Sequence, residues 1–199
     1  MVSLLMNCIH LYVDANLQLL ISFYFKYLGS GGTGKSYLAN VFAQWCEKTL
    51  RKPGDNPDQP KMMIMAFTGI AASQIGGSTV HSALGLKFGS EYLPMGDEQK
   101  SRLRKMYQHL KVVVIDELSM ISSDHLYAIH KRLQEIKGNE DPFGDVAIVL
   151  FGDLLQLPPV KGLQIFEAPS HLNVQNRALF NSNESLWKNF EVIIFLNVK

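Results

Sequence analysis

The feature that most constrains this chain is a glycine-rich loop that runs from Gly29 to Ser36. It matches G-x-x-x-x-G-K-[ST] in full, follows an apolar run at 21–28 and precedes a helical pattern at 35–50. In such a loop several backbone N–H groups meet triphosphate oxygens, and glycines are needed because side chains would block the approach. The sequence therefore predicts a nucleotide-binding loop between a buried strand and a helix whose N-terminus faces the phosphates.

The loop supplies eight candidate residues for binding ATP together with Mg²⁺. They are Gly29, Ser30, Gly31, Gly32, Thr33, Gly34, Lys35 and Ser36. We expect the ammonium of Lys35 to contact the β- and γ-phosphates and the hydroxyl of Ser36 to ligate Mg²⁺. The alternative, a glycine-rich turn with a chance lysine, is disfavoured by the full match and by a second motif further along the chain.

That second motif is an apolar run at 112–115 that ends in Asp116 and Glu117. The carboxyl ends of parallel strands form the ligand crevice of an α/β sheet, so Asp116 and the loop are expected to face the same crevice. We expect Asp116 to bind Mg²⁺, directly or through water, and Glu117 to orient or deprotonate the attacking water. The alternative is an acidic pair at a helix start. A glutamate beside the aspartate favours a hydrolase over a P-loop kinase.

Short apolar runs alternate with helical patterns along the chain. Apolar runs occupy 21–28, 61–67, 112–115, 146–151 and 192–196, and helical patterns occupy 35–50, 97–110 and 122–136. Continuous apolar runs bounded by turn residues are typical of strands buried on both faces. The alternation predicts an α/β fold with a parallel sheet flanked by helices on both faces. Lys26 is unusual in this scheme, because a buried strand rarely tolerates a lysine.

Composition narrows the classes of function. A chain of 199 residues with 47% hydrophobic residues is expected to form one globular domain. The formal net charge is only +1, so any contact with DNA must be local or shared with a partner domain. The apolar stretch 17–25 is shorter than the ~20 residues that span a bilayer, and we expect no membrane anchor.

A third segment, 151–160, follows the fourth apolar run and contains Gln156 and two prolines that fix the backbone. The amide of Gln156 is able to hydrogen-bond a γ-phosphate and so to distinguish ATP from ADP. The alternative is a strand-to-loop turn with no catalytic role, and residue chemistry alone leaves both interpretations open.

Taken together, these blocks resemble the first RecA-like domain of a superfamily 1 DNA helicase of the petite-integration-frequency (PIF) type, which moves 5′→3′. The matching blocks lie at 29–36, 67–72 with 76–82, 115–120, and 152–159 preceded by 142–144. The resemblance implies a RecA-like P-loop ATPase domain over 21–199, after a divergent N-terminal segment at 1–20. It also implies an ATP-dependent, monomeric DNA helicase of the nucleus or mitochondrion, with roles in DNA repair, recombination and telomere maintenance.

The resemblance further implies a path for single-stranded DNA. In this family, a Thr-Gly-x-Ala-Ala turn and a Thr-x-His-Ser segment lie along that path. The residues implicated here are Thr68, Gly69, Thr79, His81 and Ser82. A hydroxyl or a backbone N–H at a helix start binds a DNA phosphate without reading sequence. For His81, a hydrogen-bonded structural histidine is the alternative.

The sequence departs from the family pattern towards both ends. Family members carry an upstream glutamine that contacts adenine, but Gln18 lies too near the first strand for that role, which leaves adenine specificity open. Family members also continue into a second RecA-like domain, whose arginine finger is worth about 10³–10⁵ in rate. We therefore expect the 199 residues of this chain to bind Mg·ATP weakly, to hydrolyse it poorly and not to unwind DNA alone. The alternative function is a regulatory nucleotide-binding module without motor activity.

Overall fold

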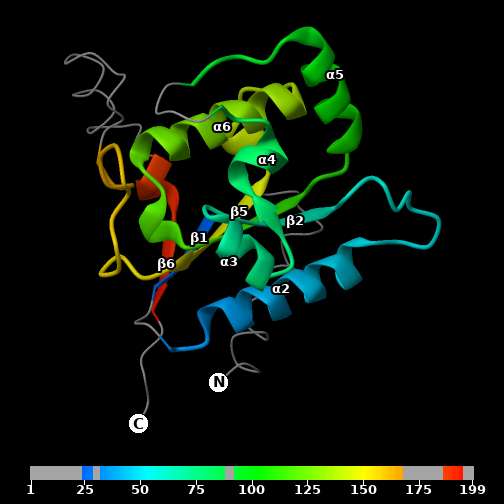
Figure 1. Ribbon diagram of the computed structural model, residues 1–199. Helices are drawn as coiled ribbons and strands as arrows, with labels where there is room; N and C mark the ends of the chain where they lie inside the picture. The colour runs from blue at the N-terminus through cyan, green and yellow to red at the C-terminus, as the bar shows by residue number, and fades with distance from the viewer. Residues whose placement is uncertain (1–23, 29–31, 88–91, 168–185, 195–199) are drawn as a thin grey trace.

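The computed structural model describes residues 24–28, 32–87, 92–167 and 186–194, and these form a three-layer α/β arrangement (Figure 1). At its centre is a six-stranded sheet with the order β3-β2-β4-β5-β1-β6, in which every pairing is parallel. The strands are β1 (Tyr24–Leu28), β2 (Met62–Ala66), β3 (Ser78–Thr79), β4 (Val112–Asp116), β5 (Ala147–Gly152) and β6 (Glu191–Ile194).

Helices cover both faces of this sheet. The α-helices are α2 (Lys35–Leu50), α3 (Gly69–Gln74), α4 (Val80–Leu84), α5 (Asp97–Met106) and α6 (Ser123–Lys137). Short 3₁₀ helices are η1 (Leu118–Met120), η2 (Pro142–Asp145) and η4 (Leu186–Asn189). In Figure 1, α2 and α3 lie below the sheet, whereas α4, α5 and α6 lie above it.

Along the central strands, successive side chains pack alternately against the helices on one face of the sheet and on the other. Val112 and Val114 of β4 pack in one apolar cluster with Phe42 of α2. The intervening Val113 and Ile115 belong to the larger cluster that contains the apolar stripe of α6. Because successive side chains of a strand point to opposite faces, a run that is apolar at every position is needed here. The predicted α/β fold with helices on both faces is therefore confirmed.

Element boundaries agree with the sequence-based expectations to within a few residues, with one larger difference. The helix expected at 97–110 ends at Met106. It ends there because Tyr107 closes the last turn through its backbone N–H and donates its hydroxyl proton to the carbonyl oxygen of Ala83, 2.9 Å away. The chain then turns into β4, with Leu110 fully buried.

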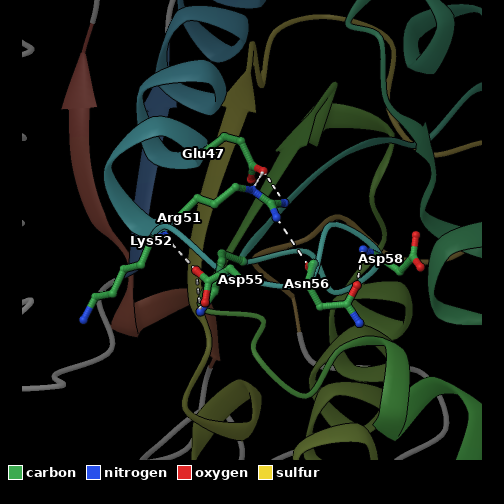
Figure 2. Close-up of polar contacts among 7 residues, drawn as sticks. Glu47, Arg51, Lys52, Asp55, Asn56 and Asp58 are labelled. Atoms are coloured by element: carbon green, nitrogen blue, oxygen red, sulfur yellow. Dashed lines mark hydrogen bonds and ion pairs between the residues drawn. The ribbon is translucent and has the colours of Figure 1, made fainter.

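The loop at 52–60 follows α2 and is fixed by local polar contacts (Figure 2). Arg51 donates from Nε to Oε1 of Glu47, one turn earlier, at 2.6 Å. The backbone N–H of Lys52 donates to Oδ2 of Asp55 at 2.7 Å. These bonds close the C-terminal end of α2 and return the chain towards β2.

Lys26 lies within β1, between β5 and β6, and is only 7% exposed. Its ammonium lies 3.8 Å from the ring centroid of Trp187 and donates to the carbonyl oxygen of the same residue at 3.4 Å. Burial lowers the pKa of Lys26. The aromatic face and the carbonyl oxygen together compensate for lost hydration, which explains how a buried strand holds this lysine.

The proposed N-terminal segment, 1–20, lies outside the described residues. Within the described ranges, no helix combines the length and the apolar character that crossing a bilayer requires.

Candidate nucleotide site

The phosphate loop leads directly into α2. Gly34 is its N-cap, with φ 82° and ψ 20°, and Gly32 has φ 76°. These left-handed conformations favour glycine, so the backbone itself explains the glycines at these two positions. The ammonium of Lys35 donates to Oγ1 of Thr33 over 3.5 Å. Gly29, Ser30 and Gly31 lie outside the described residues.

The two carboxylates follow one another at the carboxyl end of β4. Asp116 is 4% exposed, and its Oδ1 accepts a hydrogen bond from the backbone N–H of Glu117 at 2.9 Å. Glu117 has φ 59° and ψ 47°, a left-handed conformation that costs a residue with a side chain roughly 1–2 kcal/mol. Its side chain makes no capping bond to η1. The interpretation of this acidic pair as a helix cap therefore lacks its defining contact.

A pocket of about 340 Å³ unites residues from three separate sequence blocks. Its lining residues are Gly32, Gly34, Lys35, Ser36, Tyr37, Asp116, Glu117, Gly152 and Gln156. The loop before α2 and the ends of β4 and β5 meet there because these strands are parallel, with β5 between β4 and β1. This is the crevice at the carboxyl ends of the strands that the sequence predicts.

Gln156 reaches the pocket from a tight turn after β5. Oδ1 of Asp153 accepts from the backbone N–H of Leu155, and the Asp153 carbonyl oxygen accepts from the N–H of Gln156, both at 3.0 Å. Asp153 is buried, whereas Gln156 is exposed. The turn thus presents the amide of Gln156 to the pocket.

Two pocket residues, Tyr37 and Gly152, were not among the candidates from the sequence. Tyr37 directly follows the motif, and its position was the only available signal. Gly152 is required because a Cβ there would lie 2.8 Å from the backbone nitrogen of Leu118. The end of β5 therefore lies close against the segment just after Glu117, and no local sequence pattern indicates this close approach.

The donors present suit a magnesium ion shared with a phosphate chain. Ser36 offers a hydroxyl oxygen and Asp116 a carboxylate oxygen in the same pocket. Mg²⁺ usually takes one or two protein oxygens, and substrate phosphates and waters complete its shell. In the part of the chain that the structure describes, no cluster of three or more His, Cys, Asp or Glu side chains forms a metal site.

The five candidate DNA-binding residues gather at the starts of α3 and α4. Thr68 is the N-cap of α3, and Thr79 is the N-cap of α4. Because Ala66 of β2 pairs with Thr79 of β3, the two segments leave the same edge of the sheet side by side. Gly69 and Ser82 are both exposed.

His81 is half-buried in a small aromatic cluster. Its ring centroid lies 5.3 Å from that of Phe67 and 5.7 Å from that of His125. Burial lowers the pKa of His81, which disfavours the charged imidazolium form. These contacts fix the position of the ring, and the neighbouring Ser82 is exposed.

Thr68 also contacts the nucleotide pocket. Its hydroxyl donates to Oε2 of Glu117 at 3.2 Å, across 49 positions of sequence. The start of α3 and the candidate catalytic carboxylate are therefore directly linked.

Comparisons with known proteins identify the family of the chain. A family model described as PIF1-like helicase matches residues 7–199. The ATP-dependent DNA helicase RRM3 of Saccharomyces cerevisiae is 35% identical over 137 residues, which are 67% of this chain and 18% of that protein. The chain thus spans less than a fifth of that curated relative's length.

Solved structures give the same result. The crystal structure of Pif1 helicase from Candida albicans matches with a TM-score of 0.62 and 26% identity, over 93% of this chain and 39% of that one. Pif1 helicase from Bacteroides in complex with ADP-AlF3 and single-stranded DNA matches with a TM-score of 0.60 and 25% identity, over 94% and 42%. A family model covers residues 7–199, and three of the four matching blocks contribute residues to one pocket; the chain belongs to the PIF1-like helicase family.

Proposed function

We propose that this chain is the ATP-binding and ATP-hydrolysing first motor domain of a DNA helicase. One observation carries the proposal: Lys35, Asp116, Glu117 and Gln156, from three distant blocks, line a single pocket. Each has the chemistry that phosphoryl transfer to water requires. A nucleotide-binding module without motor activity is the weaker alternative, since none of these groups is missing.

Binding is assigned to the loop and the start of α2. In the proposed site, backbone N–H groups of the glycine-rich loop and the N-terminal end of α2 bind the phosphates, and the Lys35 ammonium neutralises charge on the β- and γ-phosphates. Ser36 and Asp116 would hold Mg²⁺, which when bound would supply charge stabilisation for phosphoryl transfer. Tyr37, exposed beside Ser36, borders the same space.

Hydrolysis is assigned to Glu117 and Gln156. The Glu117 carboxylate orients the attacking water and accepts its proton. The Gln156 amide donates to the γ-phosphate and so distinguishes ATP from ADP. Both side chains face the pocket from the carboxyl ends of adjacent strands, β4 and β5.

Single-stranded DNA is the proposed macromolecular partner. Thr68, Gly69, Thr79, His81 and Ser82 lie at the starts of α3 and α4, where hydroxyl and backbone N–H groups are able to bind phosphates without reading bases. A related Pif1 structure contains single-stranded DNA together with a nucleotide analogue, which supports the assignment.

The wider role follows the family resemblance. We propose a monomeric enzyme of the nucleus or mitochondrion that acts in DNA repair, recombination and telomere maintenance. Unwinding is proposed to require a second RecA-like domain, whose arginine finger is worth about 10³–10⁵ in rate. The 199 residues alone are expected to hydrolyse ATP slowly and not to separate strands.

The test is the ATPase rate of the chain with Mg²⁺, measured with and without single-stranded DNA. We expect a slow, DNA-stimulated rate that disappears in Lys35→Ala and Glu117→Gln. A rate that persists in both variants would place hydrolysis elsewhere and reject the proposed site. Detectable ATP binding with a flat background rate would favour the non-motor alternative.

A further inference from the structure

We propose that Thr68 is the positioning residue of Glu117, and that single-stranded DNA releases Glu117 by accepting, in its place, the hydrogen bond that the Thr68 hydroxyl donates. This inference rests on the proposed function, because it assumes that Glu117 activates water and that DNA reaches the start of α3. It adds to that function a direct link by which bound DNA controls hydrolysis.

The hydroxyl of Thr68 makes two hydrogen bonds. Oγ1 accepts from the backbone N–H of Ala71 at 3.2 Å, which caps α3. The same oxygen donates its proton to Oε2 of Glu117 at 3.2 Å. A threonine hydroxyl has a single proton to donate. The donor capacity of Thr68 is therefore fully used by Glu117.

A DNA phosphate is an acceptor only, so it competes with Glu117 for that proton. Thr68 is half-buried, and the next two residues, Gly69 and Ile70, are exposed, with Ile70 77% exposed. DNA is therefore proposed to approach Thr68 from this exposed side of α3. Thr68 cannot donate to a phosphate oxygen and to the Glu117 carboxylate at the same time.

The backbone of Glu117 is held separately from its side chain. Its N–H donates to Oδ1 of Asp116 at 2.9 Å, and its left-handed conformation fixes the direction in which the side chain leaves. Loss of the bond to Thr68 therefore frees the carboxylate without moving Asp116. An oxygen that already accepts a hydrogen bond is a poorer acceptor for the proton of water. DNA binding is expected to make Oε2 of Glu117 available to the attacking water.

The coupling between bound DNA and Glu117 must act in both directions, which provides a test that needs no hydrolysis. If DNA and Glu117 compete for one proton, removal of the Glu117 carboxylate must strengthen DNA binding, and only where Thr68 is present. The affinity of the chain for a fluorescein-labelled oligothymidylate is measured for wild type, Glu117→Ala, Thr68→Val and the double variant. We expect Glu117→Ala to tighten binding about 3- to 10-fold more in the wild-type background than in the Thr68→Val background.

Two controls separate this effect from charge and from helix capping. Glu98→Ala removes one negative charge from an exposed position on α5 and should change DNA affinity equally in both backgrounds. Thr68→Ser keeps the hydroxyl and should restore the difference. Equal effects of Glu117→Ala in the two backgrounds would overturn the inference.

The rate of hydrolysis gives a second readout. Thr68→Val is expected to raise the DNA-independent rate several-fold and to bring the ratio of the DNA-stimulated to the basal rate close to one, whereas Thr68→Ser keeps the wild-type ratio. Equal loss of both rates in Thr68→Val would show a merely structural role and would contradict the proposal. If wild type binds neither oligothymidylate nor nucleotide, the proposed function fails as well; if it binds both but the cycle shows no interaction, this inference alone fails.

Discussion

The backbone N–H of Glu117 donates a hydrogen bond to Oδ1 of Asp116 over 2.9 Å, and this bond holds the Asp116 carboxylate against the backbone of Glu117. Asp116 stays buried at the end of β4, whereas the left-handed backbone of Glu117 turns its side chain aside. Residues in such conformations often lie at functional sites, where the surrounding structure compensates for the strain. In the proposed site, Asp116 is thus able to bind the metal ion while Glu117 activates the attacking water.

Replacement of Glu117 by Gln is expected to separate hydrolysis from binding. Gln has nearly the same shape but cannot accept the proton of water, so the hydrolysis rate should fall about 10²–10⁴-fold. The affinity for a fluorescent ATP analogue should change little, because Glu117 does not contact the phosphates in the proposed arrangement. Glu98→Gln, at an exposed position of α5, is the matched control. A parallel loss of nucleotide affinity in Glu117→Gln would contradict the assignment of Glu117 as the base.

Gly152→Ala tests the contact between β5 and the segment that follows Glu117. The new Cβ would lie 2.8 Å from the backbone nitrogen of Leu118, so η1 must shift. We expect about 1–3 kcal/mol of lost stability in urea unfolding, together with slower hydrolysis. Gly96→Ala is the control, because a Cβ there meets no atom within 4 Å. Equal stability of the two variants would show that η1 adapts without cost.

We expect His130 to lower the free energy of unfolding in mild acid. Its Nδ1 accepts from the backbone N–H of Phe143 at 3.0 Å, and burial, assisted by the charge of Lys131, lowers the pKa of His130 to about 4. An unfolded histidine has a pKa of about 6.5, so between these values the unfolded chain binds the extra proton. Stability should therefore fall by about 1–2 kcal/mol as the pH drops from 7.5 to 5.

The control for this pH effect is His130→Asn, whose side-chain oxygen is able to accept the same backbone bond. The variant should lose the part of the pH dependence that comes from position 130, as measured by urea unfolding at both pH values. An unchanged difference between pH 7.5 and pH 5 would mean that other groups cause the acid sensitivity.

The contact between Lys26 and Trp187 is expected to contribute to stability as a coupled pair. Unfolding free energies of Lys26→Met, Trp187→Leu and the double variant form a cycle that isolates the interaction between the two side chains. We expect a coupling of about 0.5–2 kcal/mol, since the ammonium lies 3.8 Å from the ring centroid. Additive effects would show that Lys26 is tolerated for another reason.

Much of the fold could be predicted because its signals are local. The apolar run at 112–115 and the helical stripe at 122–136 each identify their own element, and parallel order follows from their alternation. The shared pocket of Lys35 and Asp116 follows from one general rule about the carboxyl ends of parallel strands.

Other features were not predictable because they depend on contacts between distant residues. The bond from Thr68 to Glu117 spans 49 positions, and Trp187 meets Lys26 only through the position of η4 beside β1. Helices α3 and α4 are too short for a periodic pattern to reveal them. Nothing in the local sequence around Gly152 indicates the close approach of Leu118.

The most direct test of the central claim is the binding of a fluorescent ATP analogue to the wild-type chain and to Lys35→Ala, with and without Mg²⁺. Circular dichroism would establish that both proteins are folded. The account predicts saturable, Mg²⁺-dependent binding to wild type and at least about a tenfold loss of affinity in Lys35→Ala, because in the proposed site the Lys35 ammonium contacts the β- and γ-phosphates. Equal binding to the two proteins, or no binding to folded wild type, would contradict the assignment of this pocket to ATP.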